Sequence, residues 1–264
     1  MITGCTDGIG EALSFEFARK GLNLVLISRD EKKLESTKQR IMIQYPTTEC
    51  IISAIDFSSF TPANRTAITE LLAPLDVGIL VNNVGASYPF TKYFHELQDS
   101  SVDGIMSVNV ESTTWMTRIV LPGMIQRKRG SIVNMSSAAG VTVSPLLSQY
   151  SAAKSYVTMF SKALSIELAD FNIHVQVQIP LYVATKLSKI WSTSFLVPSA
   201  QDFARASVAC IGYEYMVSPY WSHAICLWCM SFIPEWFIEA WLVKLSHYSI
   251  RRAGLRKEQS KRES

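Results

Sequence analysis

Three side chains in the middle of the sequence have the types and the spacing for acid–base chemistry on a carbonyl group. Tyr150 and Lys154 stand four positions apart, so on a helix they share one face, one turn apart. A tyrosine with a pKa near ~10 is a poor acid or base at neutral pH until a nearby cation such as Lys154 favours its charged form. Ser137, thirteen positions before Tyr150, can stabilise charge that develops on a carbonyl oxygen. In isolation, the pair would fit a core tyrosine and a surface lysine better.

A glycine-rich turn at the start of the chain, "TGCTDGIG", has the composition of a pyrophosphate-binding loop. Its glycines permit a tight turn and let the backbone and the N-terminus of the next helix approach a pyrophosphate. Glycines alone also fit an ordinary turn, but this turn lies between a short apolar stretch and a helical pattern. We therefore predict a dinucleotide site formed by Gly4, Thr6, Asp7, Gly8, Ile9 and Gly10.

Polar residues follow three further predicted strands. After "NLVLI", the acidic residue that would bind a ribose 2′-hydroxyl is missing, and Ser28 and Arg29 take its place. An arginine can pair with a 2′-phosphate, which favours NADP(H) over NAD(H), although Arg29 also fits a solvated residue at a helix entry. Asp56 can accept a hydrogen bond from an adenine amino group, and the asparagines of "NNVG", which contains Asn83 and Gly85, can tie strands together. Asp56 and the asparagines also fit plain capping residues.

Strand patterns and helical patterns alternate along the chain. Continuous apolar strand patterns occur at "NLVLIS", "CIISAID", "VGILVNN", "GSIVNMSS" and "IHVQVQIP", with helical patterns between them. Such strands separated by helices indicate a parallel sheet covered on both faces. We therefore predict an α/β fold with a doubly wound parallel sheet of the Rossmann-like type. Ligands of this fold bind beyond the carboxyl ends of the strands, where the polar residues named above fall.

The composition fits a large globular domain. A chain of 264 residues with 48% hydrophobic and 18% charged residues can bury a substantial core. The net charge of +3 is too small to indicate nucleic-acid binding. Five scattered cysteines form no disulfide framework, and Cys226 and Cys229 lack the second pair of ligands that a zinc site needs. We therefore predict no metal site and expect these two thiols to be buried.

In chain order, the glycine turn, "NNVG", a helical asparagine, a serine and YxxxK resemble the pattern of the short-chain dehydrogenase/reductase family over nearly the whole sequence. The resemblance implies that Tyr150 protonates a carbonyl oxygen as hydride arrives from a nicotinamide. Lys154 would hold the nicotinamide ribose and lower the pKa of the tyrosine. Ser137 would position the substrate carbonyl, and Asn109 would hold the water of a proton relay. Ser136 is the neighbouring alternative to Ser137, but the thirteen-residue offset from Tyr150 favours Ser137.

The stretches "PLYVATK" at 180–186 and "PYWSHA" at 219–224 resemble a subgroup that contains very-long-chain 3-oxoacyl-CoA reductases and 17β-hydroxysteroid dehydrogenases. By this resemblance, Pro180, Val183 and Thr185 belong to the binding site for NADPH, with Val183 and Thr185 near the nicotinamide carboxamide. The implied reaction is the NADPH-dependent reduction of a long-chain 3-oxoacyl-CoA to the 3-hydroxyacyl-CoA in microsomal fatty-acid elongation. Two alternatives stay open, a ketosteroid dehydrogenase and a non-catalytic partner protein of the elongase.

We divide the sequence into an NADP(H)-binding and catalytic domain at 1–212 and a C-terminal extension at 213–264. The extension contains the apolar run "AICLWCMSFIPEWFIEAWLV", in which Pro234 and two glutamates leave no stretch of the ~20 residues that span a bilayer. This run predicts an interfacial or re-entrant membrane element or the wall of an acyl channel, with packing against the sheet as the alternative. In the basic tail, Lys261 and Arg262 resemble a dibasic retrieval signal of the endoplasmic reticulum.

These features and the resemblance predict a protein of the endoplasmic reticulum membrane, with its catalytic domain facing the cytosol, beside the other fatty-acid elongase subunits. The helices that carry Asn109 and Tyr150 often form dimer surfaces in the resembled family, so a homodimer is a further expectation. Only Met1 and Ile2 precede the glycine turn, so we expect a truncated first strand in a fragment of a longer protein. Loss of a central strand leaves backbone groups unpaired at about 1 to 3 kcal/mol each, which would weaken folding and NADPH binding.

Overall fold

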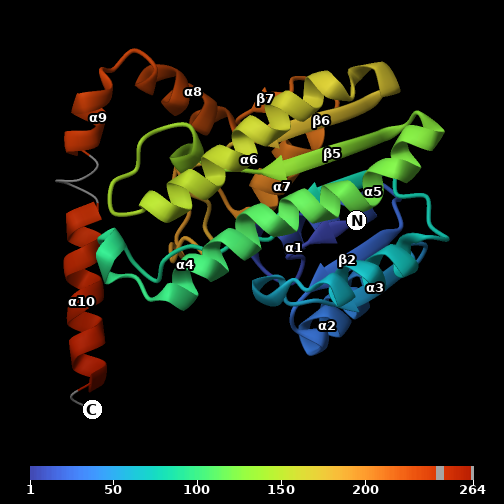
Figure 1. The fold of residues 1–264 in the computed structure, drawn as a ribbon, viewed down its shortest axis with the longest axis horizontal. Coiled ribbons are helices and arrows are strands. Elements are labelled where there is room, and N and C mark those ends of the chain that lie inside the picture. The colour runs from blue at the N-terminus through green and yellow to red at the C-terminus, as the bar shows by residue number, and fades with distance from the viewer. Residues whose placement is uncertain (242–246, 263–264) are drawn as a thin grey trace.

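A seven-stranded parallel sheet forms the centre of the protein (Figure 1). The structure is a computed structural model that describes residues 1–241 and 247–262. The strand order is β3-β2-β1-β4-β5-β6-β7, and all neighbouring strands run parallel. The strands are β1 Ile2–Thr3, β2 Leu24–Ser28, β3 Cys50–Ala54, β4 Ile79–Asn82, β5 Gly130–Met135, β6 Ile173–Gln178 and β7 Met216–Val217.

Helices cover both faces of this sheet. Residues of α3, α5 and α6 pack on one face, and residues of α1, α2 and α7 pack on the other. The helices are α1 Gly8–Arg19, α2 Glu31–Gln44, α3 Pro62–Leu72, α4 Asp99–Met106, α5 Ser112–Arg127, α6 Ser148–Glu167, α7 Ala200–Cys210, α8 Trp221–Met230, α9 Glu235–Trp241 and α10 Tyr248–Arg262. The predicted doubly wound α/β fold is therefore confirmed.

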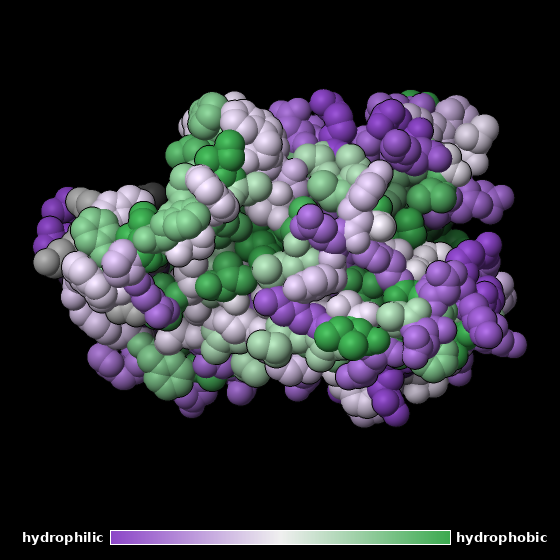
Figure 2. Space-filling model, turned by 90° about the horizontal axis from the view of Figure 1, so that it is seen from above, coloured by the Kyte–Doolittle hydropathy of each residue, from purple (hydrophilic) through white to green (hydrophobic). Residues whose placement is uncertain are grey.

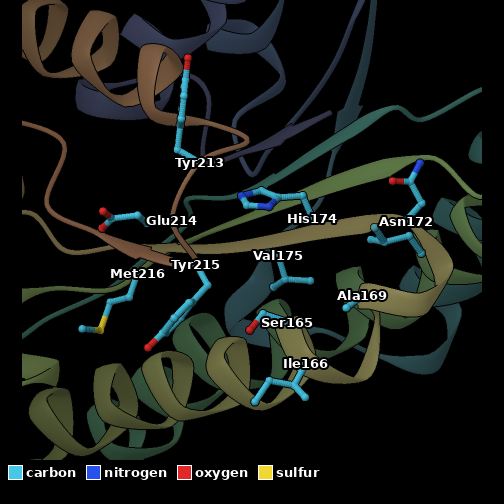
Figure 3. A pocket seen from close by; sticks show the side chains of 11 residues that line it. Ser165, Ile166, Ala169, Asn172, His174, Val175, Tyr213, Glu214, Tyr215 and Met216 are labelled. Atoms are coloured by element: carbon cyan, nitrogen blue, oxygen red, sulfur yellow. The ribbon is translucent and has the colours of Figure 1, made fainter.

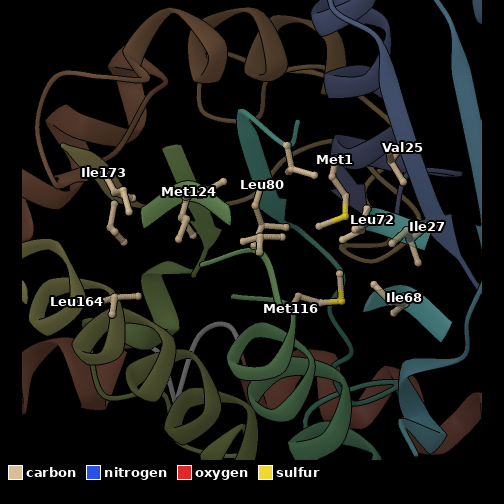
Figure 4. Packing of buried hydrophobic residues seen from close by; sticks show 14 of the residues in the cluster. Met1, Val25, Ile27, Ile68, Leu72, Leu80, Met116, Met124, Leu164 and Ile173 are labelled. Carbon is tan, nitrogen blue, oxygen red and sulfur yellow. The ribbon is translucent and has the colours of Figure 1, made fainter. Parts of the chain in front are cut away.

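Successive residues of each central strand contribute to different cores. Leu80 of β4 belongs to the core under α3 and α5, whereas its neighbour Val81 belongs to the core under α1 and α7. Figure 4 shows Leu80 among the buried side chains of its core, which include Met116 and Met124 of α5. Because side chains of a strand alternate between faces, a run such as "ILVN" needs apolar residues at consecutive positions to fill two cores. This explains the continuous apolar strands of the sequence.

The first strand is as short as the sequence predicts, but it occupies its central position. Ile2 pairs with Leu26 of β2 and with Val81 of β4, and Ile2 and Thr3 are almost fully buried. Backbone bonds continue the pairing on both sides of the strand, from Gly4 N to the Ile27 carbonyl and from Val81 N to the Met1 carbonyl. Two residues are therefore enough to bring the chain from the middle of the sheet into the glycine turn.

The sheet continues beyond the predicted domain boundary at residue 212. Strand β7 pairs with β6 through Val177 with Met216 and Gln178 with Val217. The sequence pattern predicts β6 as the last strand, because the two residues of β7 are too few to give a periodic pattern. The first part of the C-terminal segment is thus a component of the main sheet.

Helices α8 and α9 lie at one end of the molecule (Figure 1), and aromatic side chains on them and between them are exposed to solvent. Trp228 is 64% exposed, Phe232 69% and Trp236 69%, so the alternative that this run packs against the sheet is wrong for these side chains. The expectation of two buried thiols is also wrong, since Cys226 is only partly buried and Cys229 is exposed. In the described ranges 1–241 and 247–262, no helix has both the length and the apolar character to cross a bilayer.

Helix α10 returns to pack on the loop that follows β4. Lys92 pairs with Glu258 at 3.0 Å, and the hydroxyls of Tyr93 and Tyr248 lie 2.9 Å apart. Gly254 lies against Phe90 so closely that an added Cβ would be 2.2 Å from that ring. The C-terminal helix is therefore attached to a loop that leads toward the predicted site.

Candidate active site

The predicted site residues gather at the carboxyl edge of the sheet. The glycine turn follows β1, Arg29 follows β2, Asp56 lies after β3, and Asn83 follows β4. Ser137 follows β5 and Pro180 follows β6, while Asn109 and Tyr150 approach from the helices between these strands. The strand order therefore brings together residues that are far apart in sequence, as predicted.

Each glycine of the first turn meets a geometric requirement. Gly4 and Gly8 have φ angles of +66° and +54°, a conformation that side chains with a Cβ rarely adopt. An added Cβ at Gly10 would lie 2.1 Å from the Gly4 carbonyl oxygen and 2.3 Å from Asn83 Nδ2. The turn thus closes tightly over the start of α1, where the free backbone N–H groups of a helix favour an anion.

Thr3 and Asn83 fasten the glycine turn to the end of β4. Asn83 Nδ2 donates to the Thr3 and Gly4 carbonyls, both at 3.1 Å. In return, the Thr3 hydroxyl accepts from the backbone N–H groups of Asn83 and Val84, also at 3.1 Å. The prediction that these asparagines tie strands together is confirmed, because Asn82 Nδ2 also donates to Asn134 Oδ1 of β5 at 2.8 Å.

Ser28, Arg29 and Asp56 line the edge beyond β2 and β3. The hydroxyls of Ser28 and Thr6 lie 2.9 Å apart, which connects the end of β2 with the glycine turn. Arg29 is exposed, so its guanidinium is accessible to an anion. Asp56 Oδ1 accepts from the backbone N–H and the hydroxyl of Ser58, and these bonds, with the charge of Arg29, lower the pKa of Asp56. Asp56 is therefore a capping residue whose second carboxylate oxygen remains for a ligand.

Ser137, Tyr150 and Lys154 come together between β5 and α6. A hydrogen bond links the Tyr150 phenol to Ser137, and the Lys154 amine lies 5.9 Å from the centre of the Tyr150 ring. Ser136 faces the other way, with its hydroxyl 2.9 Å from the Lys154 carbonyl and 2.7 Å from the Thr158 hydroxyl. The geometry thus favours Ser137 over Ser136 as the partner of Tyr150.

The pKa of Tyr150 is raised, whereas the family resemblance implies that Lys154 lowers it. Burial raises the pKa of Tyr150 above its usual value, and the bond to Ser137 opposes this effect. A lowering of the tyrosine pKa by Lys154 is not found, because the Lys154 amine donates to the Met135 carbonyl at 2.9 Å instead of facing the phenol oxygen. Burial lowers the pKa of Lys154 to about 8.

Asn109 lies in a π-helical turn, Ser107–Glu111, between α4 and α5. Its Nδ2 donates to the carbonyls of Ala86 and Ile105, at 2.8 and 2.9 Å. A Cβ added at Gly85 would lie 3.2 Å from Asn109 Oδ1 and 3.5 Å from the Lys154 amine. Gly85 therefore leaves open a space that both Asn109 and Lys154 border, and π turns often occur at such functional positions.

The segment after β6 approaches the glycine turn. The Pro180 carbonyl accepts from Ala138 N at 3.0 Å, next to Ser137. Val183 is buried, and a Cβ added at Gly8 would lie 3.1 Å from Thr185 Cγ2. The predicted nicotinamide-side residues thus lie beside the predicted pyrophosphate turn.

An ion pair that the sequence does not indicate closes the same region. Lys186 donates to Asp7 Oδ2 at 2.7 Å, and Lys33 lies 3.9 Å from the same oxygen. Lys186 is 179 positions from Asp7, so no local pattern could indicate this contact. The pair places two cations beside the turn, where they can also meet the phosphates of a dinucleotide.

A separate pocket of about 820 Å³ lies away from these residues (Figure 3). It is lined by the end of α6, the start of β6 and residues 213–216 before and within β7. His174 at the start of β6 lines it, whereas the predicted site lies beyond the opposite end of that strand. None of the predicted site residues lines this pocket.

The close packing at Gly10 leads to a stability prediction. In Gly10→Ala, the new Cβ clashes with the Gly4 carbonyl, so we expect the free energy of unfolding to fall by about 1 to 3 kcal/mol. Gly104→Ala in α4 is the control, because an added Cβ there meets nothing within 4 Å. Urea unfolding of both variants tests this, and equal midpoints would contradict the close approach at Gly10.

The buried amine predicts a dependence of stability on pH. The pKa of Lys154 is lowered to about 8 in the folded protein, whereas an unfolded lysine has its ordinary value near ~10.4. Between these values the unfolded chain binds more protons, so the free energy of unfolding rises with pH. Relative to Lys154→Met, the wild type should gain about 3 kcal/mol across this window. Urea unfolding at several pH values measures this, and Lys20→Met, at an exposed site, is the control. If the difference in unfolding free energy between the wild type and Lys154→Met did not change with pH, the prediction would be contradicted.

The comparisons with known proteins give the family context of this site. Residues 1–194 match the family described as short chain dehydrogenase. A very-long-chain 3-oxoacyl-CoA reductase-like protein of Arabidopsis thaliana is 40% identical over 97% of this chain and 82% of its own length. The very-long-chain 3-oxoacyl-CoA reductase of Anas platyrhynchos is 38% identical over 98% of this chain and 82% of its own length. A human protein named inactive hydroxysteroid dehydrogenase-like protein 1 is 40% identical over 97% of this chain and 78% of its own length.

A solved structure agrees with these sequence relatives. The short-chain dehydrogenase from Sphingobium yanoikuyae in complex with NADPH superposes with a TM-score of 0.76 at 26% identity, covering 89% of this chain and 95% of that chain. The family match covers well over half of the sequence, and it includes the glycine turn, Asn109, Ser137, Tyr150 and Lys154. The chain belongs to the short-chain dehydrogenase family.

Proposed function

We propose that the protein is an NADPH-dependent oxidoreductase that reduces long-chain 3-oxoacyl-CoA to 3-hydroxyacyl-CoA. The observation that carries this proposal is that Ser137 lies beside Tyr150 while Lys154 and Asn109 approach Gly85, close to Asn83, which fastens the glycine turn. The substrate class rests on relatives at 38–40% identity whose names include very-long-chain 3-oxoacyl-CoA reductase. The structural neighbour from Sphingobium yanoikuyae, which was solved with NADPH, supports the cofactor.

The residues of the first turn fit a dinucleotide. Gly4 and Gly8 adopt positive φ angles and Gly10 packs on the Gly4 carbonyl, so the turn before α1 is tight and a pyrophosphate can meet the helix N-terminus. Arg29 is exposed at the end of β2, where its guanidinium can pair with a 2′-phosphate. Thr185 and the open space at Gly85 border the nicotinamide end. When bound, NADPH supplies the hydride.

Tyr150 performs the proton transfer. The Ser137 hydroxyl lies beside the Tyr150 phenol, so a substrate carbonyl oxygen bound next to them can accept a hydrogen bond from both. Because burial raises the pKa of Tyr150, the phenol is protonated at neutral pH and can donate its proton to the developing alkoxide. The Lys154 amine lies 5.9 Å from the centre of the Tyr150 ring and donates to the Met135 carbonyl, so it holds the end of β5 beside the tyrosine.

Some relatives are named as reductases and others as inactive proteins, so the percentage of identical residues alone does not decide whether this chain is active. The Arabidopsis and human relatives are both 40% identical to this chain, yet the second is named inactive. This chain has Ser137 beside Tyr150 and the Lys154 amine 5.9 Å from the Tyr150 ring centre, which favours an active enzyme over a non-catalytic elongase partner. The ketosteroid alternative shares this chemistry and differs only in the body of the substrate.

Tyr150→Phe tests the proposed reaction. The variant keeps the ring and loses the proton donor, so kcat for NADPH-dependent reduction of a long-chain 3-oxoacyl-CoA should fall by about 10²- to 10⁴-fold. Tyr156→Phe is a matched control, since Tyr156 is exposed on the same helix and bonds to Thr114. NADPH should bind both variants with similar affinity. Undiminished turnover in Tyr150→Phe would exclude the mechanism, and faster turnover of a ketosteroid would favour the alternative substrate.

We also propose that the protein works at the endoplasmic reticulum membrane, with the catalytic domain in the cytosol beside other elongase enzymes. The support is the exposed aromatic surface of α8 and α9, which includes Trp221, Trp228, Trp236 and Trp241. Figure 2 shows mainly apolar and weakly polar residues over that end and hydrophilic residues at the opposite end. Tryptophans on an amphipathic surface are suited to the membrane interface. The side chains of the predicted dibasic pair, Lys261 and Arg262, lie outside the described residues.

Vesicle binding tests the membrane proposal. The double change Trp228→Ser and Trp236→Ser removes two exposed aromatic rings, so the partition coefficient onto phospholipid vesicles with anionic lipid should fall about tenfold or more. Tyr213→Ser is the control, because Tyr213 is 79% exposed beside the pocket of Figure 3. Equal binding of the double variant and the wild type would contradict this role of α8 and α9.

A further inference from the structure

His223 of α8 is completely buried although it lies next to exposed residues. Its relative exposure is 0%, whereas Trp221 on the same turn is 53% exposed. The imidazole packs edge-on to the Tyr220 ring at 5.4 Å and at an angle to the Phe203 ring of α7 at 6.3 Å. A buried imidazole needs a partner for each nitrogen, so its two hydrogen bonds indicate its role.

The two nitrogens of His223 bond to the two ends of one segment. Leu181 N donates to Nδ1 at 3.3 Å, and Nε2 lies 3.1 Å from the Leu196 carbonyl oxygen. Since the Leu196 carbonyl can only accept and Leu181 N–H can only donate, both bonds form only in the neutral tautomer that carries hydrogen on Nε2. Burial also lowers the pKa of His223, which keeps the ring neutral. One side chain thus joins backbone groups fifteen positions apart.

The joined segment, residues 181–196, carries part of the candidate active site. It contains Val183 and Thr185, and Thr185 packs against Gly8 of the glycine turn. It begins directly after Pro180, which bonds to the backbone beside Ser137. The position of Leu181 therefore sets how this segment lies relative to both halves of the site.

The same turn of α8 holds the far end of the segment. Phe195 meets Trp221 edge to face, with ring centroids 4.8 Å apart. A backbone hydrogen bond from Ala184 N to the Pro198 carbonyl, at 3.0 Å, also joins the two ends of the segment, and it does not involve His223. Loss of the imidazole would consequently loosen the segment without detaching it, so a variant can still fold.

We propose that His223 is a positioning residue that holds segment 181–196 against the cofactor and substrate site. It touches no reacting atom in this arrangement, and it acts through the backbone at Leu181 and Leu196. The catalytic part of this inference rests on the proposed reductase function. The structural part can be tested without any activity.

Limited trypsin digestion tests the structural part, because Lys186 and Lys189 lie within the segment. In His223→Phe, which keeps a ring but loses both hydrogen bonds, we expect cleavage at these lysines to be about tenfold faster, since a fastened loop must open before cleavage. His223→Gln keeps one hydrogen-bond acceptor and one donor, so trypsin should cleave it at nearly the same rate as the wild type. His174→Phe, the same change on β6, is the control and should also match the wild type. Equal cleavage of His223→Phe and the wild type would overturn the proposal.

Kinetics test the positioning of the site. In His223→Phe, kcat should fall about 10- to 100-fold because the nicotinamide side is misplaced, while binding of 2′,5′-ADP, which probes only the adenosine half, stays unchanged. His223→Gln should restore most of kcat. Parallel loss of 2′,5′-ADP binding would overturn the proposal, because it would indicate general damage to the fold. If the wild type itself reduces no 3-oxoacyl-CoA, the proposed function fails, and the digestion result still decides the role of His223.

A smaller variant covers the case in which His223→Phe does not fold. The side chain of His223→Asn can accept from Leu181 N but is too short to reach Leu196 as well. Trypsin should therefore cleave this variant faster than His223→Gln. A cleavage rate equal to that of the wild type would overturn the proposal.

Discussion

The geometry of the site depends on two hydrogen bonds between Lys154 of α6 and the end of β5. Its Nζ donates to the Met135 carbonyl at the end of β5, and its own carbonyl accepts from the Ser136 hydroxyl, both at 2.9 Å. A Cβ added at Gly140 would lie 2.7 Å from the same carbonyl. These contacts hold α6 against the end of β5, so Tyr150, one turn earlier, meets Ser137. Placing an amine here is unfavourable for its charged form, which is why its pKa is lowered.

Most of this arrangement could be predicted from the sequence because it follows from strand ends. Continuous apolar strands indicated the parallel sheet, and parallel strands place all their carboxyl ends on one edge, so Arg29, Asn83 and Ser137 had to lie together. The direction of the Tyr150 pKa shift could not be predicted, since it depends on how far burial outweighs a charge whose position spacing does not fix. Strand β7 is too short for any pattern, and the Lys186–Asp7 contact joins positions with no local relation.

The C-terminal segment 213–264 contributes to the site through the loops that surround it. Helix α8 holds the segment after β6 through His223, and α10 holds the loop after β4 through the pair of Lys92 with Glu258. The Thr91 hydroxyl of the same loop donates to the carbonyl of His247, directly before α10, at 2.7 Å. His247 Nδ1 also contacts the Pro145 carbonyl, in the stretch between Ser137 and Tyr150. A boundary at residue 212 therefore divides elements that position one site. The sequence indicated an extension because its composition changes there, but composition does not indicate contacts.

The two sides of the site are fastened by contacts of different strength. The glycine turn is held to the end of β4 by partly buried hydrogen bonds that Asn83 donates to Thr3 and Gly4, and loss of such a bond costs about 1 to 3 kcal/mol. The segment after β6 meets the turn through Lys186 and Asp7, whose side chains are 63% and 39% exposed. An exposed ion pair contributes only about 0 to 1 kcal/mol, so this contact can open at little cost when a dinucleotide brings phosphates to the same cations. The glycine turn is therefore held rigidly, whereas segment 181–196 can adjust its position. The imidazole of His223, which is fully buried, limits how far that segment can move.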